Sequence, residues 1–321
     1  MVVGPISGRI AVVGTGVIGA GWAAYFLAKG FDVAATDPAD GAEKRLRTLI
    51  DGFWPTLERI GLAEGASRSR LRFDPDIARA VEGCAFVQES GPERIDVKRD
   101  LLARISAAVP ADSLIATSSS GILISDIQDA AAHPERVLLG HPFNPAHLIP
   151  LVEVVGGRLT SEDTIRNALA FYSSIGKKPI RIRRELKGHV ADRLQAALWQ
   201  EAFYLVQQGI ASVEDVDTAI ADGPGLRWAL LGPFLNLHLS GGSGGIAHAL
   251  EHLGPPVESW WRDLGKVALN EELNEAIARG VAEELGGADL AGLARRRDDA
   301  LLALLQLKAG MPDHRDRSEG N

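Results

Sequence analysis

The sequence predicts an α/β fold: a Rossmann-type N-terminal domain with a mostly parallel sheet, followed by an all-α C-terminal domain. Two observations predict this. Short apolar runs alternate with helix-like patterns over the first half of the 321-residue chain, and from about Lys187 onwards only helical periodicity remains. We therefore expect an N-terminal domain at residues 1–185 and a helical domain at residues 186–321.

Short runs of apolar residues predict the strands of the first domain. Their near-continuous apolar character is typical of a parallel sheet covered by helices on both faces. A helical pattern from Val17 to about Lys29 follows the first run. The predicted strands are Arg9–Val13, Asp32–Thr36, Cys84–Glu89, Ser113–Thr117, Arg136–His141, Leu148–Val155 and Pro179–Arg183.

The second domain is predicted from helical periodicity and from the residues that end each pattern. Gly209 is a candidate C-terminal cap, and Ser212 with Asp215 three residues later is typical of a capping box. The run "SGGSGG" at residues 240–245 predicts a loop. The predicted helices are 188–209, 212–223, 271–285 and 290–308.

Bulk composition excludes several classes of function. A formal net charge of −8 argues against nucleic acid or an anionic membrane as the main partner. The single cysteine, Cys84, allows no intramolecular disulfide and no cysteine-based metal site. The N-terminus lacks the long apolar segment of a signal peptide, and no apolar run approaches the roughly 18 residues of a membrane span. We expect a cytoplasmic protein.

The stretch "VVGTGVIGAGWAA" places Gly14, Gly16 and Gly19 in the G-x-G-x-x-G spacing, between a predicted strand and a predicted helix. Gly14 would permit a tight turn, Gly16 would let a pyrophosphate approach the backbone, and Gly19 would let helix and strand pack closely. The N-terminus of the helix, with Val17 and Ile18, would face the phosphates. This context predicts dinucleotide binding; the alternative is a glycine turn without a cofactor.

Asp37 ends the second predicted strand, 18 residues after Gly19. A carboxylate at this place would accept both ribose hydroxyls of the adenosine and repel a 2′-phosphate. No arginine follows at once. The sequence therefore predicts NAD as cofactor in preference to NADP.

Three consecutive predicted strands end in polar residues: Glu93 and Lys98, then Ser118–Ser120, then His141 and Asn144. Each has an ordinary structural explanation, such as a helix cap, a loop histidine or a solvated helix start. Ligands of an open parallel sheet bind at the carboxyl ends of its strands. The coincidence at one edge therefore favours an active site.

These residues suit hydride transfer. Oxidation of a secondary alcohol requires removal of the hydroxyl proton, and an imidazole, whose ordinary pKa is about 6.5, can take it. We expect His141 to be this base and Glu153 to orient it, if the chain folds back between them. A serine hydroxyl and a side-chain amide can hold the substrate oxygen. No metal site is expected, because His147 lies in an apolar flank and no other histidine has ligand spacing with His141.

Five segments, in matching order, resemble the L-3-hydroxyacyl-CoA dehydrogenase superfamily. The resemblance implies that His141 and Glu153 form a catalytic dyad and that Ser120 and Asn144 lie beside the substrate oxygen, with Ser120 also near the cofactor. It implies that Glu93 lies near the ribose and nicotinamide of NAD, as does Lys98, and that the helical domain makes a homodimer. The segments are "VVGTGVIGAGWAAYFLAKG", "VQESGPERIDVKRDL", "IATSSSGI", "GHPFNPAHLIPLVEVV" and "GHVADRLQAALWQEAFYLVQQG".

The sequence also departs from the family pattern. Ser118, a candidate substrate residue, stands where the substrate loop of the family has the asparagine of "N-T-S", and Asp192 stands where "P-G-F-x-x-N-R" has its asparagine. A carboxylate at this place suits a cationic substrate better than an acyl-CoA carbonyl. The region between the second and third strands is expected to be short, with residues 67–72, "SRSRLR", as its only basic patch for CoA phosphates. A solvated arginine face is the alternative.

The C-terminal half resembles the branch of this superfamily that acts on free hydroxy acids, which implies oxidation of L-carnitine to 3-dehydrocarnitine. L-Gulonate and L-3-hydroxybutyryl-CoA are the alternative substrates, and a non-catalytic NAD-binding protein is a remote alternative. Trp199, Trp228 and Tyr204 are candidates to surround a trimethylammonium, unless they pack in the core or at an interface. Arg193 or Arg227 is expected to meet the substrate carboxylate, although Arg193 has a structural alternative.

Overall fold

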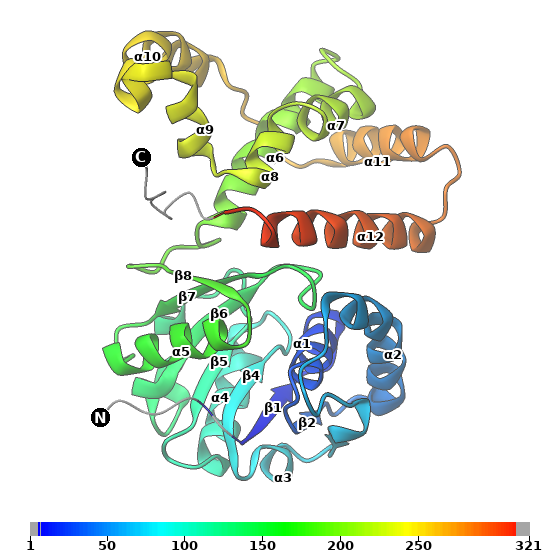
Figure 1. Ribbon diagram of the computed structural model, residues 1–321, viewed down its shortest axis with the longest axis vertical. Helices are drawn as coiled ribbons and strands as arrows, with labels where there is room; N and C mark the ends of the chain where they lie inside the picture. The colour runs from blue at the N-terminus through cyan, green and yellow to red at the C-terminus, as the bar shows by residue number, and fades with distance from the viewer. Residues whose placement is uncertain (1–5, 7, 313–321) are drawn as a thin grey trace. The chain divides into compact units, whose positions relative to one another are not determined.

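The computed structural model describes residue 6 and residues 8–312, and it divides the chain into two compact units (Figure 1). The first unit runs through Arg193 and takes in Asp298–Gln306, whereas the second comprises Leu194–Arg297 and the chain from Leu307 onwards. The structure thus divides the chain after Arg193, while the sequence predicts a boundary at residue 185. The start of the chain, at residues 1–5 and 7, lies outside the described residues.

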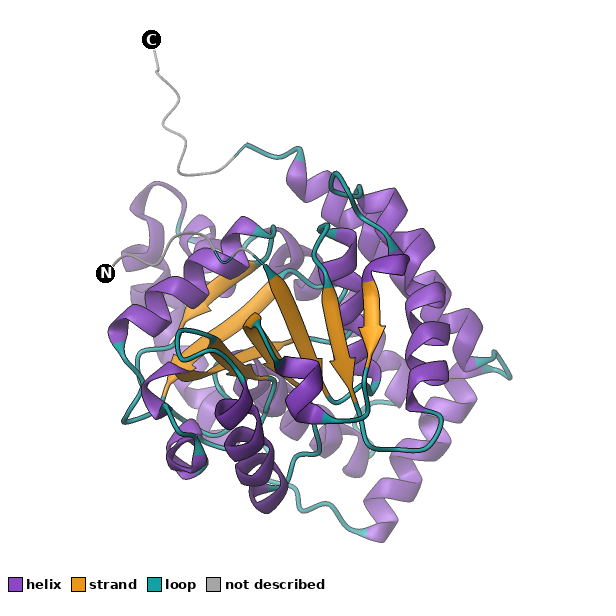
Figure 2. Cartoon of the chain, turned by 90° about the horizontal axis from the view of Figure 1, so that it is seen from below, coloured by secondary structure: helices purple, strands orange, loops and turns teal. Residues whose placement is uncertain are grey.

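The first unit is built on one eight-stranded sheet with the order β3-β2-β1-β4-β5-β6-β7-β8 (Figure 2, orange). Neighbouring strands are parallel except β6 and β7, which pair antiparallel, so the predicted mostly parallel sheet is confirmed. The strands are β1 Arg9–Val13, β2 Val33–Thr36, β3 Leu71–Phe73, β4 Cys84–Glu89, β5 Leu114–Thr117, β6 Val137–Pro142, β7 Leu151–Gly156 and β8 Lys178–Arg181.

Helices cover both faces of the sheet because successive side chains of each strand point to opposite faces. Ile10 and Val12 of β1 join one core, with Trp22 and Phe171, while Ala11 joins the other. The first core takes residues of α1, α2 and α5, and the second takes residues of α3 and α4. These helices are α1 Val17–Ala28, α2 Ala42–Ile60, α3 Ile77–Val81, α4 Ile95–Ala108 and α5 Glu162–Ser174.

The order of the strands reverses between β1 and β4, which lie side by side although β2 and β3 come between them in the chain. Such a switch point leaves a crevice at the carboxyl ends of the strands, where nucleotide ligands bind in open α/β sheets. The glycine-rich turn follows β1 at this point. The topology therefore puts this turn and the residues after β4, β5 and β6 at one edge.

Two sequence-based expectations are wrong in detail. The region between β2 and β4 is not short, because it contains the 19-residue helix α2, the strand β3 and the helix α3. The apolar residues Leu46, Ile50 and Trp54 lie on one face of α2, so its helical pattern is present in the sequence, but the interior proline Pro55 interrupts it. The strand predicted from Leu148 begins at Leu151, because the chain before it turns back from β6.

The second unit contains helices, as predicted. The capping box of Ser212 and Asp215 is present in both directions, and Gly209 has a φ of +64°, as a C-terminal cap requires. The glycine run at residues 240–245 forms a 3-10 turn that leads into α10. The helices are α6 Ala191–Gln207, which begins in the first unit, α7 Val213–Ala221, α8 Pro224–Leu230, α9 Pro233–Ser240, α10 Gly245–Asp263, α11 Glu271–Leu285 and α12 Leu290–Ala309, part of which belongs to the first unit.

The described residues lack two further features. None of their helices is long and apolar enough to cross a membrane. They also contain no cluster of three or more histidine, cysteine, aspartate or glutamate side chains that could hold a metal ion.

Candidate active site

The glycine-rich turn has the geometry that a dinucleotide requires. Gly14 adopts a φ of +88°, and a Cβ atom there would lie 2.7 Å from the backbone of Ser90 and Gly91. A Cβ atom at Gly19 would lie 1.9 Å from the carbonyl oxygen of Gly14, so only glycine lets α1 approach β1 this closely. Gly16 faces open space instead, since a Cβ atom added there would have no neighbour within 4 Å. Packing against other residues therefore does not require glycine at position 16, and the open space there is available to a ligand.

A cavity of about 320 Å³ lies beside this turn, and residues after β1, β2 and β4 line it. Asp37 is one of them. Its carboxylate accepts hydrogen bonds from the backbone N–H of Thr15 at 2.9 Å and of Ala39 at 3.0 Å, so it is held at the mouth of the glycine turn. The donor set and the open space at Gly16 fit the adenosine and pyrophosphate of NAD.

His141 and Glu153 face each other across the antiparallel strands β6 and β7, where they are direct cross-strand partners. His141 Nδ1 lies 2.9 Å from Glu153 Oε2, and both side chains are buried. An ionised carboxylate only accepts hydrogen bonds, so Nδ1 carries a hydrogen, and in the neutral imidazole Nε2 is then the nitrogen that presents a lone pair. The predicted fold-back between these two residues is confirmed.

The second oxygen of Glu153 is held by the start of α6. Oε1 accepts hydrogen bonds from the backbone N–H of Val190 and of Ala191, each at 2.9 Å. Burial by itself would raise the pKa of Glu153, but the hydrogen bonds from His141, Ala191 and Val190 outweigh it and hold the pKa below its ordinary value. Glu153 therefore remains an anion that fixes the imidazole.

Asp192 comes next on α6 and faces the other side of the imidazole. Its Oδ2 lies 3.8 Å from His141 Nε2, and its side chain is 31% exposed. A carboxylate thus stands on each side of His141: one buried and hydrogen-bonded, the other partly open to solvent. Arg193, its neighbour, is exposed, and its side chain donates a long hydrogen bond of 3.4 Å to the carbonyl oxygen of Lys187.

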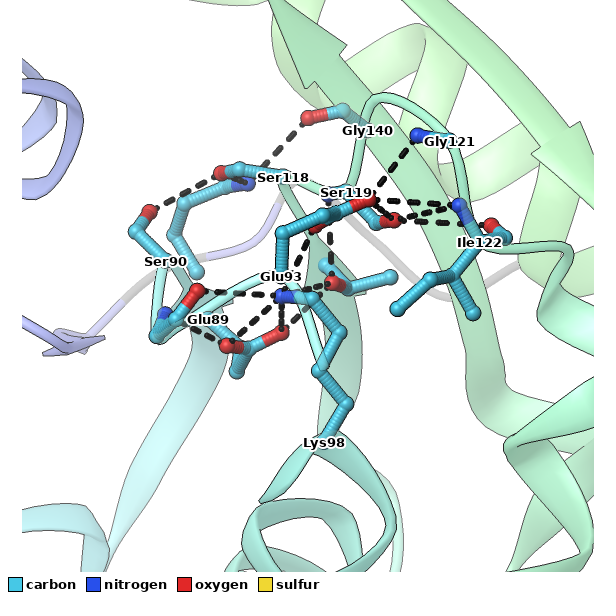
Figure 3. A network of polar contacts seen from close by, with 12 residues as sticks. Glu89, Ser90, Glu93, Lys98, Ser118, Ser119, Gly121, Ile122 and Gly140 are labelled. Atoms are coloured by element: carbon cyan, nitrogen blue, oxygen red, sulfur yellow. Dashed lines mark hydrogen bonds and ion pairs between the residues drawn. The ribbon is translucent and has the colours of Figure 1, made fainter. Parts of the chain in front are cut away.

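The loop after β5 is held by Glu93 (Figure 3). Glu93 Oε1 accepts hydrogen bonds from the hydroxyl of Ser119 at 2.5 Å and the backbone N–H of Gly121 at 2.8 Å. Burial acts to raise the pKa of Glu93, but these hydrogen bonds and the nearby Lys98 lower it below its ordinary value. Glu93 is therefore an anion that shapes the loop carrying Ser118–Ser120.

Lys98 is not at the surface but in the core, with an exposed fraction of 1%. Its Nζ donates to both oxygens of Glu89, at 3.1 and 3.0 Å, and lies 3.7 Å from Glu93 Oε2 (Figure 3). Glu89 is also fully buried. The structure thus gives Lys98 a buried ion pair that the sequence does not reveal, and its predicted place near the nicotinamide ribose stays a prediction.

The remaining predicted residues of the first unit lie at the same edge. Ser118 is half-buried and hydrogen-bonded to Gln88 and Ser90. Ser120 and Asn144 are exposed, in the loops after β5 and β6. Both positions leave the side chains accessible to a ligand.

Sequence reasoning missed His189, which is 1% exposed and has a φ of +48°. Its ring lies 5.3 Å from that of His141, and its Nε2 lies 3.2 Å from the carbonyl oxygen of Ser119. Burial lowers the pKa of His189, which favours the neutral form. The signal was present in "KGHVADR", where a histidine replaces the family's phenylalanine.

The other predicted substrate residues belong to the second unit. Trp199 of α6 is 51% exposed and Trp228 of α8 is 44% exposed, so both rings have open faces. Arg227 of α8 is exposed as well, and Tyr204 is half-buried. Within this unit they are surface side chains rather than core ones.

A glycine turn for a dinucleotide and a buried histidine–carboxylate pair at the same sheet edge define a dehydrogenase of the nicotinamide-dependent class. The family model described as "3-hydroxyacyl-CoA dehydrogenase, NAD binding domain" matches residues 9–186, and the C-terminal domain model of the same family matches residues 188–283. The chain belongs to the 3-hydroxyacyl-CoA dehydrogenase family, and it is an NAD-dependent oxidoreductase.

Several curated relatives are named L-carnitine dehydrogenase. The chain is 50% identical over 304 residues to an L-carnitine dehydrogenase from Streptomyces griseus, covering 95% of this chain and 91% of the relative. It is 48% identical over 295 residues to an L-carnitine dehydrogenase from Pseudomonas aeruginosa, covering 92% of each. The predicted resemblance is thereby confirmed.

Among solved structures, the chain is similar to one described as 5-formyl-3-hydroxy-2-methylpyridine 4-carboxylic acid 5-dehydrogenase, an NAD⁺-dependent dismutase. The TM-score is 0.82 at 28% identity, covering 95% of this chain and 99% of that chain. The similarity over nearly the whole chain supports the fold of both units.

Proposed function

We propose that the protein oxidises the 3-hydroxyl group of L-carnitine to give 3-dehydrocarnitine, with NAD as hydride acceptor. One observation carries the choice of substrate: the Asp192 carboxylate lies 3.8 Å from His141 Nε2. The trimethylammonium of carnitine is attached one carbon away from the carbon that reacts. A substrate whose hydroxyl meets Nε2 therefore brings its positive charge within reach of Asp192.

The proton is handled by the chain itself. His141 Nε2, which carries the lone pair, accepts the hydroxyl proton while the hydrogen on C3 leaves as a hydride. Glu153 stabilises the resulting imidazolium through Nδ1. The backbone N–H groups of Val190 and Ala191 hold the Glu153 carboxylate in its orientation. Bound NAD supplies the acceptor for the hydride.

The partly exposed carboxylate of Asp192 serves two needs in this proposal. It offsets the charge of the trimethylammonium in the bound substrate, and it faces solvent, to which the proton must finally pass. Trp199 and Trp228 are proposed to cover the methyl groups with their open faces, since aromatic rings attract quaternary ammonium ions. Arg193 or Arg227 is proposed to bind the substrate carboxylate.

Two of the three arginines in the basic patch that CoA phosphates would need form ion pairs with acidic side chains. Arg68 forms an ion pair with Asp51 at 2.5 Å, and Arg70 lies 3.2 Å from Asp32. Neutralised arginines attract phosphate less than free ones do. This supports a free hydroxy acid over a CoA ester.

We also propose a homodimer formed through the helical unit, in a cytoplasmic protein. The support is the set of large apolar side chains that this unit exposes, because contiguous apolar surface typically marks an interface. Among them are Phe234, Leu239, Trp260 and Trp261. Sedimentation equilibrium of the purified protein tests the dimer: a single species of monomer mass at micromolar concentration contradicts it.

The substrate is tested by NADH formation from NAD at alkaline pH with L-carnitine, L-gulonate and L-3-hydroxybutyryl-CoA at matched concentrations. We expect turnover with L-carnitine to exceed that with either other compound by at least about 100-fold in kcat/KM, a selectivity that one well-placed charge pair supports. Selective turnover of L-gulonate would retain the dyad and overturn the argument from Asp192. Turnover of the CoA ester alone would overturn the free-acid assignment.

A further inference from the structure

Gln88 is a polar residue in the middle of the sheet, and its side chain is fully buried. Burying an amide is costly unless its hydrogen bonds are made. Its Nε2 donates to the hydroxyl of Ser118 at 2.8 Å and to the carbonyl oxygen of Gly140 at 3.2 Å. Its Oε1 accepts from the hydroxyl of Tyr172 at 2.7 Å. The amide thus joins three elements of the first unit.

The orientation of this amide is determined by its partners. The carbonyl oxygen of Gly140 can only accept, so the NH₂ group of Gln88 must face it. Burial raises the pKa of the Tyr172 phenol, which therefore keeps its hydrogen and donates it to Oε1. A flipped amide would place two acceptors together at Gly140 and lose that hydrogen bond.

The direction of the hydrogen bonds has a consequence for two serines. Ser118 accepts from Gln88, and its oxygen lies 2.9 Å from that of Ser90 (Figure 3). The two hydroxyl groups carry one hydrogen each, and one of these two hydrogens forms the hydrogen bond between them. Within the described part of the chain neither hydroxyl has a further partner, and both residues are half-buried. One O–H group therefore remains to be donated to a ligand.

Gln88 also acts on the strand of the catalytic base. Gly140 immediately precedes His141 in β6, and the bond to Gln88 holds its carbonyl group. A Cβ atom at Gly140 would lie 2.1 Å from the Tyr172 oxygen, so this strand position accepts only glycine while Tyr172 bonds Gln88. Gln88 thereby ties the backbone beside His141 to the serine pair.

The position of the Ser90–Ser118 pair in the sheet indicates which part of the ligand accepts a hydrogen bond from the remaining O–H group. Ser90 and Ser118 directly follow β4 and β5, on the other side of the switch point from β2, the strand that Asp37 follows. With the adenosine half of NAD at Asp37, the nicotinamide half lies toward β4 and β5.

We propose that Gln88 is a positioning residue: held by Tyr172, it directs one hydroxyl hydrogen of the Ser90–Ser118 pair toward an oxygen atom of the nicotinamide half of the cofactor. The proposal rests on the hydride-transfer function above but not on the identity of the substrate. Without Gln88, no buried NH₂ group donates to Ser118. The hydroxyl hydrogens of the Ser90–Ser118 pair can then rotate away from the ligand.

The test is the dissociation constant of NADH, measured by fluorescence titration without substrate. Gln88→Met and Ser118→Ala should each raise Kd about three- to tenfold, which corresponds to the loss of one oriented hydrogen bond. The double variant should bind no more weakly than the weaker single variant, because Gln88 acts through Ser118. The matched control is Gln128→Met, which removes another buried glutamine of this unit, bonded to Pro134 and Thr160.

Gln128→Met should lower thermal stability and leave Kd for NADH within about twofold of the wild-type value. The same result for Gln88→Met would overturn the proposal and leave Gln88 a core residue only. If Gln88→Met does not fold, Tyr172→Phe replaces it, since that change removes one O–H group at nearly constant volume. Unchanged NADH affinity in both Tyr172→Phe and Ser118→Ala would overturn it equally. Absence of L-carnitine turnover in the wild type bears on the proposed substrate and leaves this comparison intact.

Discussion

His141 and Glu153 stand directly opposite each other on antiparallel neighbouring strands, with Nδ1 of the imidazole 2.9 Å from Oε2 of the carboxylate. Side chains at such paired positions share one face of the sheet, so the register of two strands is enough to bring them together. The loop between β6 and β7 therefore needs only to connect the two strands, and it does not itself position either side chain.

His141→Asn should reduce kcat by about 10²–10⁴-fold, because the proposed base for the hydroxyl proton is lost. Kd for NADH should stay within about twofold of the wild-type value, since the glycine turn and Asp37 are unchanged. Glu153→Gln should reduce kcat by a similar factor, because an uncharged amide cannot stabilise the imidazolium. Turnover by His141→Asn at a wild-type rate would show that another group is the base.

Asp192→Asn should weaken a cationic substrate more than a neutral one of the same shape. We expect kcat/KM for L-carnitine to fall at least about tenfold, the size of one partly exposed charge interaction. The control substrate is 3-hydroxy-5,5-dimethylhexanoate, in which a carbon replaces the nitrogen of carnitine. Equal losses for the two compounds would contradict the counter-charge role of Asp192.

Two glycines of the turn should respond differently to the same substitution. Gly16→Ala should fold normally, because nothing lies within 4 Å of the added Cβ, but should bind NADH at least about tenfold more weakly. Gly19→Ala should be destabilised, because its Cβ would meet the Gly14 carbonyl oxygen at 1.9 Å. Thermal unfolding and NADH titration of both variants test this. A Gly16→Ala protein with wild-type NADH affinity would contradict the assignment of the pyrophosphate to this turn.

Asp37→Asn should relax the choice between NAD and NADP. The carboxylate repels a 2′-phosphate, and an amide of the same size does not. We expect the ratio of kcat/KM with NAD to that with NADP to fall about tenfold or more. The amide oxygen can still accept from the Thr15 backbone, and only the exposed hydrogen bond from Ala39 is lost, so the fold should be retained. An unchanged ratio would mean that other residues select the cofactor.

Lys177 predicts a pH dependence of stability. It is buried, donates to the carbonyl oxygens of Ala146 and Ile149 between β6 and β7, and burial with nearby Lys29 lowers its pKa from 10.5 to about 7. Between pH 7 and 10.5 the unfolded chain therefore binds more protons than the folded one, so stability from this group rises with pH. The stability contributed by neutral Lys177 is fully present above pH 10.5 and is lost as the pH falls through 7.

The comparison that isolates this effect is wild type against Lys177→Met in urea unfolding at several pH values. Relative to the variant, the wild type should gain up to about 1.4 kcal/mol per pH unit across this window. The variant should also be less stable at the alkaline end, because two buried carbonyl groups lose their donor. Parallel pH profiles for the two proteins would contradict the depressed pKa.

Much of this protein is determined by short segments of its sequence. The glycine turn, the carboxylate of Asp37 at a strand end and the capping box at Ser212 each depend on residues within a few positions of one another, so spacing alone predicts them. The alternation of strands and helices predicts the parallel sheet for the same reason. The imidazole of His141 could be singled out because its strand ends at the ligand-binding edge.

Only the tertiary structure decided what those residues touch. The pairing of Lys98 with Glu89, the capture of Glu153 by the start of α6, and the approach of Asp192 to His141 join segments that spacing cannot relate. The buried link from Tyr172 through Gln88 spans 84 positions. Such contacts depend on strand order and on the direction in which each helix leaves the sheet, and these follow from the packing of the whole unit.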